Sequence, residues 1–162
     1  MTTIATDGLT IAAEGQAQTS WGSISSRSYK KVRVANDCVF ALTGAAGVFD
    51  ALIAWHKAGC DPSTLPECTK KDGWCLLEIR QDGSAHMYTQ EVPYADPIEF
   101  PFALGTGCDF AVGAMDAGKS PREAVEIAIR RDANSGGNID VIDIKEALGL
   151  REPGLRVVNQ KD

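Results

Sequence analysis

The sequence has few of the residues that bind metal ions or polyanions. Its 162 residues include two histidines, and its five cysteines are irregularly spaced and match no zinc-binding pattern. The net charge is -6, and the only Lys/Arg cluster is Lys30-Lys31-Val32-Arg33. A surface for nucleic acid or an anionic membrane would need a larger basic patch. We therefore expect no metal site, no cofactor and no nucleic-acid partner.

Long apolar segments are also missing. No apolar run approaches the ~18 residues of a membrane-spanning helix, and the polar N-terminus is unlike a signal peptide. We therefore expect a cytoplasmic protein with free thiols and no membrane contact. A chain of 162 residues can bury roughly two thirds of its unfolded surface in one domain. Residues 1–162 are expected to form that single domain.

Several segments have the alternation and the flanking turn residues of β-strands. Two Asp-Gly pairs, Asp7-Gly8 and Asp82-Gly83, each lie between two such segments and predict two-residue hairpin turns. In the first hairpin, Leu9, Ile11 and Ala13 are expected to share one buried face. The predicted strands are residues 2–6, 9–13, 31–34, 38–42, 74–80, 85–90, 102–104, 139–144 and 155–158.

Apolar residues at helical spacing occur between these strands. Val48, Leu52 and Trp55 predict a helix that ends at Gly59. Ser120-Pro121-Arg122-Glu123 is a capping box with proline at the first helical position, so a second helix begins there. Antiparallel hairpins with helices grouped between them predict an α+β layered domain. The other helices are predicted at residues 108–117 and 145–149, and the main loops at residues 14–28 and 60–72.

The candidate chemistry begins at the N-terminal residues Met1-Thr2-Thr3-Ile4. Thr2 is small enough for removal of Met1, and its hydroxyl and α-amine would then belong to one residue. An α-amine titrates near pH ~7.7 to 8.0, so it can take the hydroxyl proton and activate a threonine nucleophile. The alternative is an ordinary Met-Thr start without a catalytic role. Cys108 is a less favoured nucleophile, since no histidine lies near it in the sequence.

Other segments gain a meaning if Thr2 is a nucleophile. Lys31 is a candidate cation for the alkoxide, and Glu14 is placed to hold that lysine. The turn 44–47 offers backbone N–H donors to an oxyanion. The string Arg131-Asp132-Ala133-Asn134-Ser135-Gly136-Gly137 is either a helix end with a glycine stop or a cluster that supports the amine. If Thr2 has no catalytic role, Lys31 is interpreted as a surface lysine and Glu14 as part of a turn.

Five segments together resemble one protein family. In chain order they are Thr2-Thr3-Ile4, Glu14-Gly15-Gln16, Lys30-Lys31-Val32-Arg33, Gly105-Thr106-Gly107 and the string from Arg131 to Gly137. They resemble the corresponding segments of proteasome β-subunits and of the peptidase of the ATP-dependent HslVU protease. The resemblance implies that this chain is a short member of the family, of bacterial or phage type. The resemblance covers nearly the whole chain. It implies a four-layer αββα sandwich of two antiparallel sheets, the N-terminal nucleophile hydrolase fold, with a reduced helix layer.

The resemblance also implies roles for individual residues. Thr2 matches the nucleophile, and an N–H of Ala45 or Ala46 matches the oxyanion donor. Tyr29, Arg33 and Thr43 are placed by analogy around the first specificity pocket. The remaining catalytic matches are Lys31, its partner Glu14 where the family has aspartate, Asp132, Ser135, and Thr106 where the family has serine.

The activity that the resemblance implies is threonine-dependent cleavage of peptide bonds. Polypeptide substrates, a homo-oligomeric ring and an ATP-dependent unfoldase are the expected partners. Family members usually carry a second long helix where this chain has the loop 60–72. Two alternatives stay open: a ring or scaffold subunit without catalytic activity, and an amidohydrolase for small molecules on the same fold.

Overall fold

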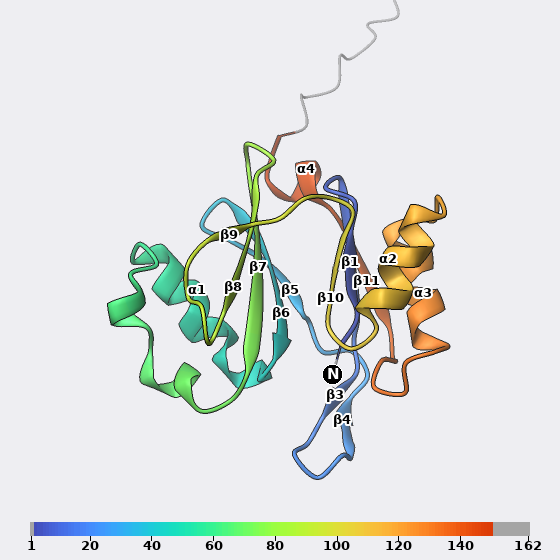
Figure 1. Cartoon of the computed structure of the whole chain (residues 1–162), viewed down its shortest axis with the longest axis horizontal. Helices are drawn as coiled ribbons and strands as arrows, with labels where there is room; N and C mark the ends of the chain where they lie inside the picture. The colour runs from blue at the N-terminus through green and yellow to red at the C-terminus, as the bar shows by residue number, and fades with distance from the viewer. Residues whose placement is uncertain (1, 151–162) are drawn as a thin grey trace, which may run out of the picture.

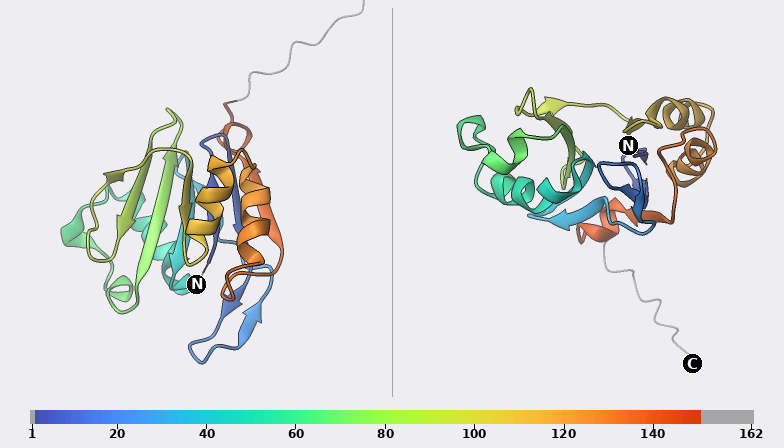
Figure 2. Two further views of the ribbon diagram at one scale, coloured as in Figure 1. Left: turned by 45° about the vertical axis from the view of Figure 1, so that its right-hand side comes forward. Right: turned by 90° about the horizontal axis from the view of Figure 1, so that it is seen from below.

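Two antiparallel β-sheets pack face to face and carry helices on their outer faces (Figures 1 and 2). The computed structural model describes residues 2–150. The first sheet has the strand order β10-β1-β2-β11 and the second the order β5-β6-β7-β8-β9. The strands of the first sheet are β1 (Ile4–Thr6), β2 (Thr10–Glu14), β10 (Phe102–Leu104) and β11 (Ile139–Asp143). Those of the second are β5 (Val32–Ala35), β6 (Cys38–Gly44), β7 (Trp74–Arg80), β8 (Ala85–Thr89) and β9 (Asp96–Pro97).

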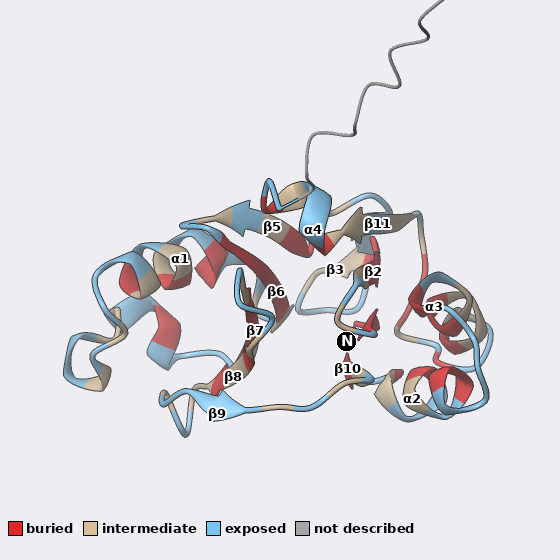
Figure 3. Cartoon of the chain, turned by 90° about the horizontal axis from the view of Figure 1, so that it is seen from above, coloured by how far each residue is buried: buried red, intermediate tan, exposed pale blue. Residues whose placement is uncertain are grey.

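The main core lies between the two sheets. Ile4, Ile11 and Leu104 of the first sheet pack with Val39 and Leu77 of the second. These side chains are 7% exposed or less, and Figure 3 shows the buried residues concentrated in the strands and on the helices that cover them. The short helix α4 (Ile144–Ala147) adds the buried Ile144 to this core. The sheets are thus held together mainly by aliphatic contacts, which stabilise in proportion to the apolar area removed from water.

Helices α2 (Cys108–Asp116) and α3 (Pro121–Ile129) cover the outer face of the first sheet. The contact is made largely by alanines, with Ala5 and Ala12 of the sheet against Ala111 and Ala124 of the helices. Small side chains let the helix axes approach the sheet closely. The predicted capping box at Ser120 is confirmed, since its side chain and that of Glu123 each accept a backbone N–H from the other residue.

Helix α1 (Phe49–Lys57) covers the outer face of the second sheet. Its buried residues Phe49, Leu52 and Trp55 pack on Phe40 and Leu76 of the sheet. The 3-10 turns η1 (Ala46–Val48), η2 (Pro62–Thr64) and η3 (Glu67–Lys70) flank this helix on either side. Among the described residues, a single α-helix covers this face, which confirms the reduced helix layer. The four layers confirm the predicted α+β sandwich. In residues 2–150 no helix has both the length and the apolar character needed to span a membrane.

Some local expectations were wrong, and one lies outside the described residues. Leu9 is 60% exposed at the hairpin turn, whereas Ala12 is fully buried, because helices cover the second face of β2. The predicted loop 14–28 contains a small hairpin of β3 (Ala17–Gln18) and β4 (Ile24–Ser26), which extends from the body of the protein. The strand expected at residues 155–158 lies beyond residue 150.

The antiparallel pairing brings distant parts of the chain to one end of the sheets. Because β1 is antiparallel to both β2 and β10, the start of β1 lies beside the ends of those strands, with Ile4 opposite Ala13 and Leu104. Likewise, Val32 at the start of β5 pairs with Ala41 in the middle of β6, and the Leu42 N–H that follows donates to the carbonyl of Lys31. The residues just before β1 and β5, and just after β2, β6 and β10, therefore meet at this end.

Candidate active site

Thr2 is held at the start of β1 by the turn that follows β10. The Gly107 N–H donates to the Thr2 carbonyl at 3.3 Å, and the Thr2 nitrogen donates to the Thr106 hydroxyl at 3.4 Å. Thr2 is 2% exposed. Gly105 has φ +93°, and a Cβ there would lie 2.1 Å from the Thr2 carbonyl oxygen. Gly105 is therefore needed because the backbone of Thr2 passes directly against it, and Gly107 because a Cβ there would lie 2.0 Å from the Thr3 hydroxyl oxygen.

We expect Gly105→Ala to displace Thr2 and to destabilise the fold. Gly118 is the matched control, because it has φ +85° but nothing lies within 4 Å of a Cβ placed on it. Both substitutions pay about 1–2 kcal/mol for a left-handed alanine, but only Gly105→Ala adds a clash with backbone. Urea unfolding should show the larger loss of unfolding free energy for Gly105→Ala. Equal losses for the two variants would show that the close approach is unimportant.

Glu14 and Lys31 form a buried ion pair beside Thr2. The Lys31 ammonium donates to Glu14 Oε1, and the two side chains are 6% and 0% exposed. The same Oε1 accepts the N–H of Thr3 at 3.3 Å, whereas Oε2 accepts the N–H groups of Gln16 at 2.7 Å and Gly136 at 2.9 Å. Glu14 therefore connects Lys31 to the residue after Thr2. Glutamate is one methylene longer than the aspartate found in the family, and this extra length does not prevent the ion pair from forming.

Burial lowers the pKa of Lys31 below its usual value. The hydrogen bond and the charge of Glu14 act in the opposite direction but are outweighed. The cause is desolvation of the ammonium group at the bottom of the site, which disfavours the charged form. Lys31 is therefore a more ready proton donor than an exposed lysine.

A second polar cluster connects Thr2 to Asp132. The Thr106 hydroxyl donates to Asp132 Oδ2 at 2.6 Å, and Ser135 Oγ donates to the same oxygen at 2.6 Å. Ser135 Oγ also lies 2.7 Å from the Thr3 hydroxyl. Burial would raise the pKa of Asp132, but the hydrogen bonds from Ser135, Thr106 and Asn134 outweigh it and lower that pKa. An ionised Asp132 thus lies one hydroxyl away from the Thr2 nitrogen.

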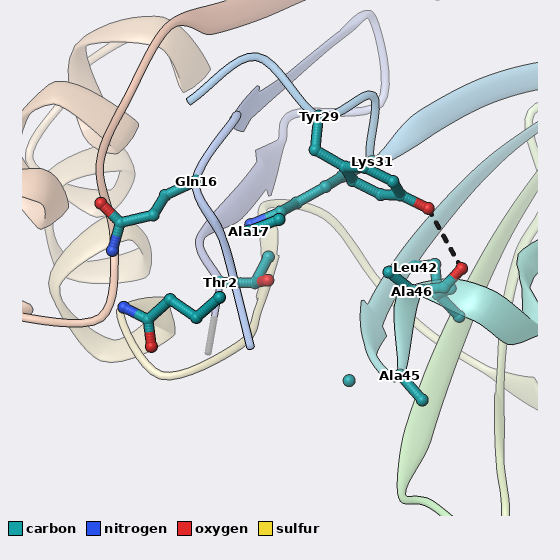
Figure 4. Close-up of a pocket in the computed structure, with 10 residues that line it drawn as sticks. Thr2, Gln16, Ala17, Tyr29, Lys31, Leu42, Ala45 and Ala46 are labelled. Atoms are coloured by element: carbon teal, nitrogen blue, oxygen red, sulfur yellow. Dashed lines mark hydrogen bonds between the residues drawn. The ribbon is translucent and has the colours of Figure 1, made fainter. Parts of the chain in front are cut away.

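A pocket of about 160 Å³ opens in front of Thr2 and Lys31 (Figure 4). Tyr29 lines this pocket as expected, and its hydroxyl donates to the carbonyl of Ala46 at 3.1 Å. The other lining residues come from the β2–β3 region and the end of β6. They are Gln16, Ala17, Gln18, Leu42, Gly44, Ala45 and Ala46.

Arg33 and Thr43 do not line this pocket, so their predicted placement was wrong. Arg33 points toward α1, where it pairs with Asp50 and its guanidinium lies 4.4 Å from the Phe49 ring centroid. Thr43 lies on β6 opposite Cys75 of β7. Successive strand residues face opposite sides, and sequence proximity to the pocket does not reveal which residue faces it.

The turn after β6 distinguishes between the two candidate oxyanion donors. The Ala45 N–H donates to the carbonyl of Gly73 at 3.1 Å. Within residues 2–150, no protein acceptor is found for the N–H of Ala46. Gly44 has φ +92°, which sets the direction of this turn. Ala46 is therefore the better-placed donor for a ligand in the pocket.

Sequence reasoning missed Thr3 and Gln16. Thr3 is completely buried, and its hydroxyl links Ser135 to the N-terminal strand. Gln16 is 6% exposed, lines the pocket, and approaches Gly136 so closely that a Cβ there would lie 2.6 Å from Gln16 Oε1. Both residues adjoin predicted site residues, which was the available signal. Cys108 begins α2, and burial raises the pKa of its thiol, which argues against a nucleophilic role.

The comparisons with known proteins identify the architecture. The structure superimposes on eukaryotic HslV from Trypanosoma brucei with a TM-score of 0.64, at 20% sequence identity, covering 87% of this chain and 97% of HslV. The chain has the fold of HslV. The structure is also similar to BPH from Thiobacillus denitrificans, with a TM-score of 0.59 at 19% identity, covering 88% of this chain and 97% of BPH. BPH in complex with epoxomicin gives a TM-score of 0.58 at 19% identity, with coverage of 88% and 98%.

These similarities lie in structure and not in overall sequence. No protein-family model matches the chain, and no curated protein matches it. At sequence identities of 19–20%, these structural similarities show the fold alone. Function has to be argued from the site itself.

Proposed function

We propose that this chain is a threonine-type endopeptidase of the N-terminal nucleophile hydrolase class, with Thr2 as its nucleophile after removal of Met1. The observation that carries the proposal is the double contact of Glu14 Oε1 with the Lys31 ammonium and the Thr3 N–H. That contact attaches a buried cation to the residue next to Thr2. The HslV-like fold supports a protease of this general type.

In the proposed reaction, the Thr2 hydroxyl attacks the scissile carbonyl and its proton passes to the α-amine of Thr2. While Met1 is attached, that nitrogen is an amide and cannot act as a base. The positive charge of Lys31 lowers the pKa of the amine and stabilises the alkoxide. Asp132, through the Thr106 hydroxyl, orients the amine and balances its charge once it is protonated.

The oxyanion that forms on the substrate carbonyl is stabilised by a backbone donor, for which we propose the Ala46 N–H. When the oxyanion collapses, the scissile C–N bond breaks and the leaving amine takes the proton held by the Thr2 α-amine, which leaves an ester on Thr2. This ester is then hydrolysed by a water that the Thr2 amine activates. Each turnover regenerates the free hydroxyl and amine.

The substrates we propose are unfolded polypeptides, cleaved inside a homo-oligomeric ring in the cytoplasm. An ATP-dependent unfoldase would supply these substrates to the ring. The Thr2 pocket has a volume of about 160 Å³, which suits one side chain of a peptide. Residues 1–162 would act as a single peptidase domain in each subunit.

Intact mass spectrometry combined with a threonine-directed electrophile tests the proposal. The purified protein should lack one methionine and should gain one molecule of the electrophile on Thr2. Native mass and digestion of an unfolded protein would support the ring protease. Cleavage of small amides alone would favour the small-molecule amidohydrolase. A processed protein that is never labelled would favour the inactive ring subunit.

The lowered pKa of Asp132 predicts a loss of stability in acid. Its ordinary pKa is 3.8 and its folded value is lower, so the native state favours the ionised form. The stabilisation is therefore fully present above about pH 4 and is lost as the pH falls through the folded pKa. Unfolding free energies of the wild type and Asp132→Asn should differ by a constant amount above pH ~4. That difference should shrink at lower pH, and a constant difference would contradict the prediction.

A further inference from the structure

A polar cluster separate from the candidate active site lies on the outer face of the second sheet, under α1. Glu78 of β7 is completely buried at its centre. Cys38 of β6 and His56 of α1 approach the same oxygen, with Cys38 Sγ at 3.5 Å and His56 Nε2 at 2.7 Å from Glu78 Oε1. None of these three residues lines the Thr2 pocket, so the proposed peptidase reaction does not use them.

Glu78 has further polar neighbours in this cluster, and two buried histidine nitrogens of the cluster have no hydrogen-bond partner among the described residues. Glu78 Oε2 accepts the Tyr88 hydroxyl at 3.0 Å and lies 3.7 Å from His86 Nδ1. The Nδ1 atoms of His56 and His86 are buried and have no hydrogen-bond partner within residues 2–150. Buried polar atoms are normally satisfied, and unpaired ones indicate a water, an ion or a functional role.

We propose that Cys38, His56 and Glu78 form a binding site for a divalent zinc-like cation. A thiolate, an imidazole and a carboxylate are the donor types that Zn²⁺ prefers, and three protein ligands leave a fourth position for water. The cation would join α1 to β6 and β7. This site is independent of Thr2 and of the proposed peptidase activity.

The distances are close to those of such a site. The three ligand atoms lie within 4.8 Å of one another. In a tetrahedral site with bonds of about 2.0–2.3 Å, ligand atoms are roughly 3.3–3.8 Å apart. The separation of 3.5 Å between Cys38 Sγ and Glu78 Oε1 already falls in this range. The hydrogen-bonded pair of His56 and Glu78 would have to open by about half an ångström to reach the same geometry.

The charges of the ligands also match a divalent cation. Binding displaces the Cys38 proton to solvent, so the thiolate and the Glu78 carboxylate together neutralise the ion. Arg80 competes with it, since its Nε donates to Glu78 Oε1 at 2.7 Å and its Nη2 to Oε2 at 3.1 Å. The Arg80 side chain is 42% exposed, so it can move into solvent when the cation enters. Removal of Arg80 should therefore tighten binding.

Cobalt is the probe that tests the site directly. Titration of the full chain with Co²⁺ should give one equivalent bound, with visible absorption of a tetrahedral site, a thiolate-to-cobalt charge-transfer band and release of one proton. Zn²⁺ should displace the cobalt. Cys38→Ser should abolish the charge-transfer band, and His56→Gln should weaken binding at least tenfold. Cys75→Ser is the matched control, because this partly buried thiol lies on β7 but packs against the core between the sheets.

Arg80→Gln keeps the test decisive if the ligand variants fail to fold. A cation site predicts at least tenfold tighter Co²⁺ binding in this variant. A purely structural ion pair predicts lower stability and no binding. The proposal is overturned if the wild type binds no Co²⁺ in the tetrahedral form. It is also overturned if the charge-transfer band persists in Cys38→Ser or disappears in Cys75→Ser.

Discussion

Thr2→Ala is expected to remain folded and to lose peptide hydrolysis by about 10³-fold or more. The variant lacks the only atom that attacks the carbonyl, and loss of a nucleophile removes the covalent step entirely. The fold should tolerate the change, because alanine keeps the backbone nitrogen and carbonyl that hydrogen-bond to Thr106 and Gly107 in the turn after β10. Initial rates on an unfolded protein and on a peptide amide, with circular dichroism as the check on folding, measure the effect.

Thr2→Ser is the matched control for this experiment. Serine keeps the hydroxyl and the α-amine on one residue, so activity should fall much less than in Thr2→Ala. Both variants also need the same N-terminal processing, which intact mass would verify. If Thr2→Ala cleaved peptides as fast as the wild type, Thr2 would not be the nucleophile, even though the chain has the fold of HslV.

Lys31→Met is expected to cost about 3–5 kcal/mol of unfolding free energy and to abolish hydrolysis. The substitution leaves the Glu14 carboxylate buried without its counter-charge, which is the expensive way to break a buried ion pair. It also removes the cation beside the proposed nucleophile. Chemical denaturation gives the stability, and labelling of Thr2 by the electrophile reports the chemistry separately.

Lys30→Met provides a neighbouring comparison. Lys30 also pairs with a carboxylate, Asp140, but its side chain is 67% exposed. Exposed ion pairs contribute about 0–1 kcal/mol, so this variant should be close to the wild type in stability and activity. If the two variants behaved alike, the buried pair of Lys31 and Glu14 would have no special role.

Local signals in the sequence predicted much of the fold. The existence of the two hairpins and the capping box at Ser120 were predicted correctly, because each depends on interactions between residues a few positions apart. The two-residue Asp-Gly turns were wrong in detail, because the Asp7 N–H donates to the Thr10 carbonyl and the Arg80 N–H to the Ser84 carbonyl, which places the turns at residues 8–9 and 81–83. Leu9 was misplaced because alternation assumes one buried face, whereas β2 is covered on both. The β3–β4 hairpin carried no clear apolar pattern and was missed.

The candidate site was also predicted only in part. Glu14, Lys31, Thr106, Asp132 and Ser135 were chosen from short segments and do meet around the start of β1. Their catalytic roles remain predictions. Arg33 and Thr43 were placed wrongly because the direction of a strand side chain depends on register. The Cys38, His56 and Glu78 cluster had no sequence pattern, since its members lie on three elements far apart in the chain.

The sequence by itself determined the turns, the helix starts and the residue types available for chemistry, because these depend on backbone preferences and on side chains close together in the chain. Only the tertiary structure decided which of those side chains share a buried space. Antiparallel pairing placed the start of β1 against the ends of β2 and β10. Burial lowers the pKa of Lys31. It would raise the pKa of Asp132 and Glu78, but the hydrogen bonds that the fold gives these two carboxylates outweigh burial and lower their pKa values.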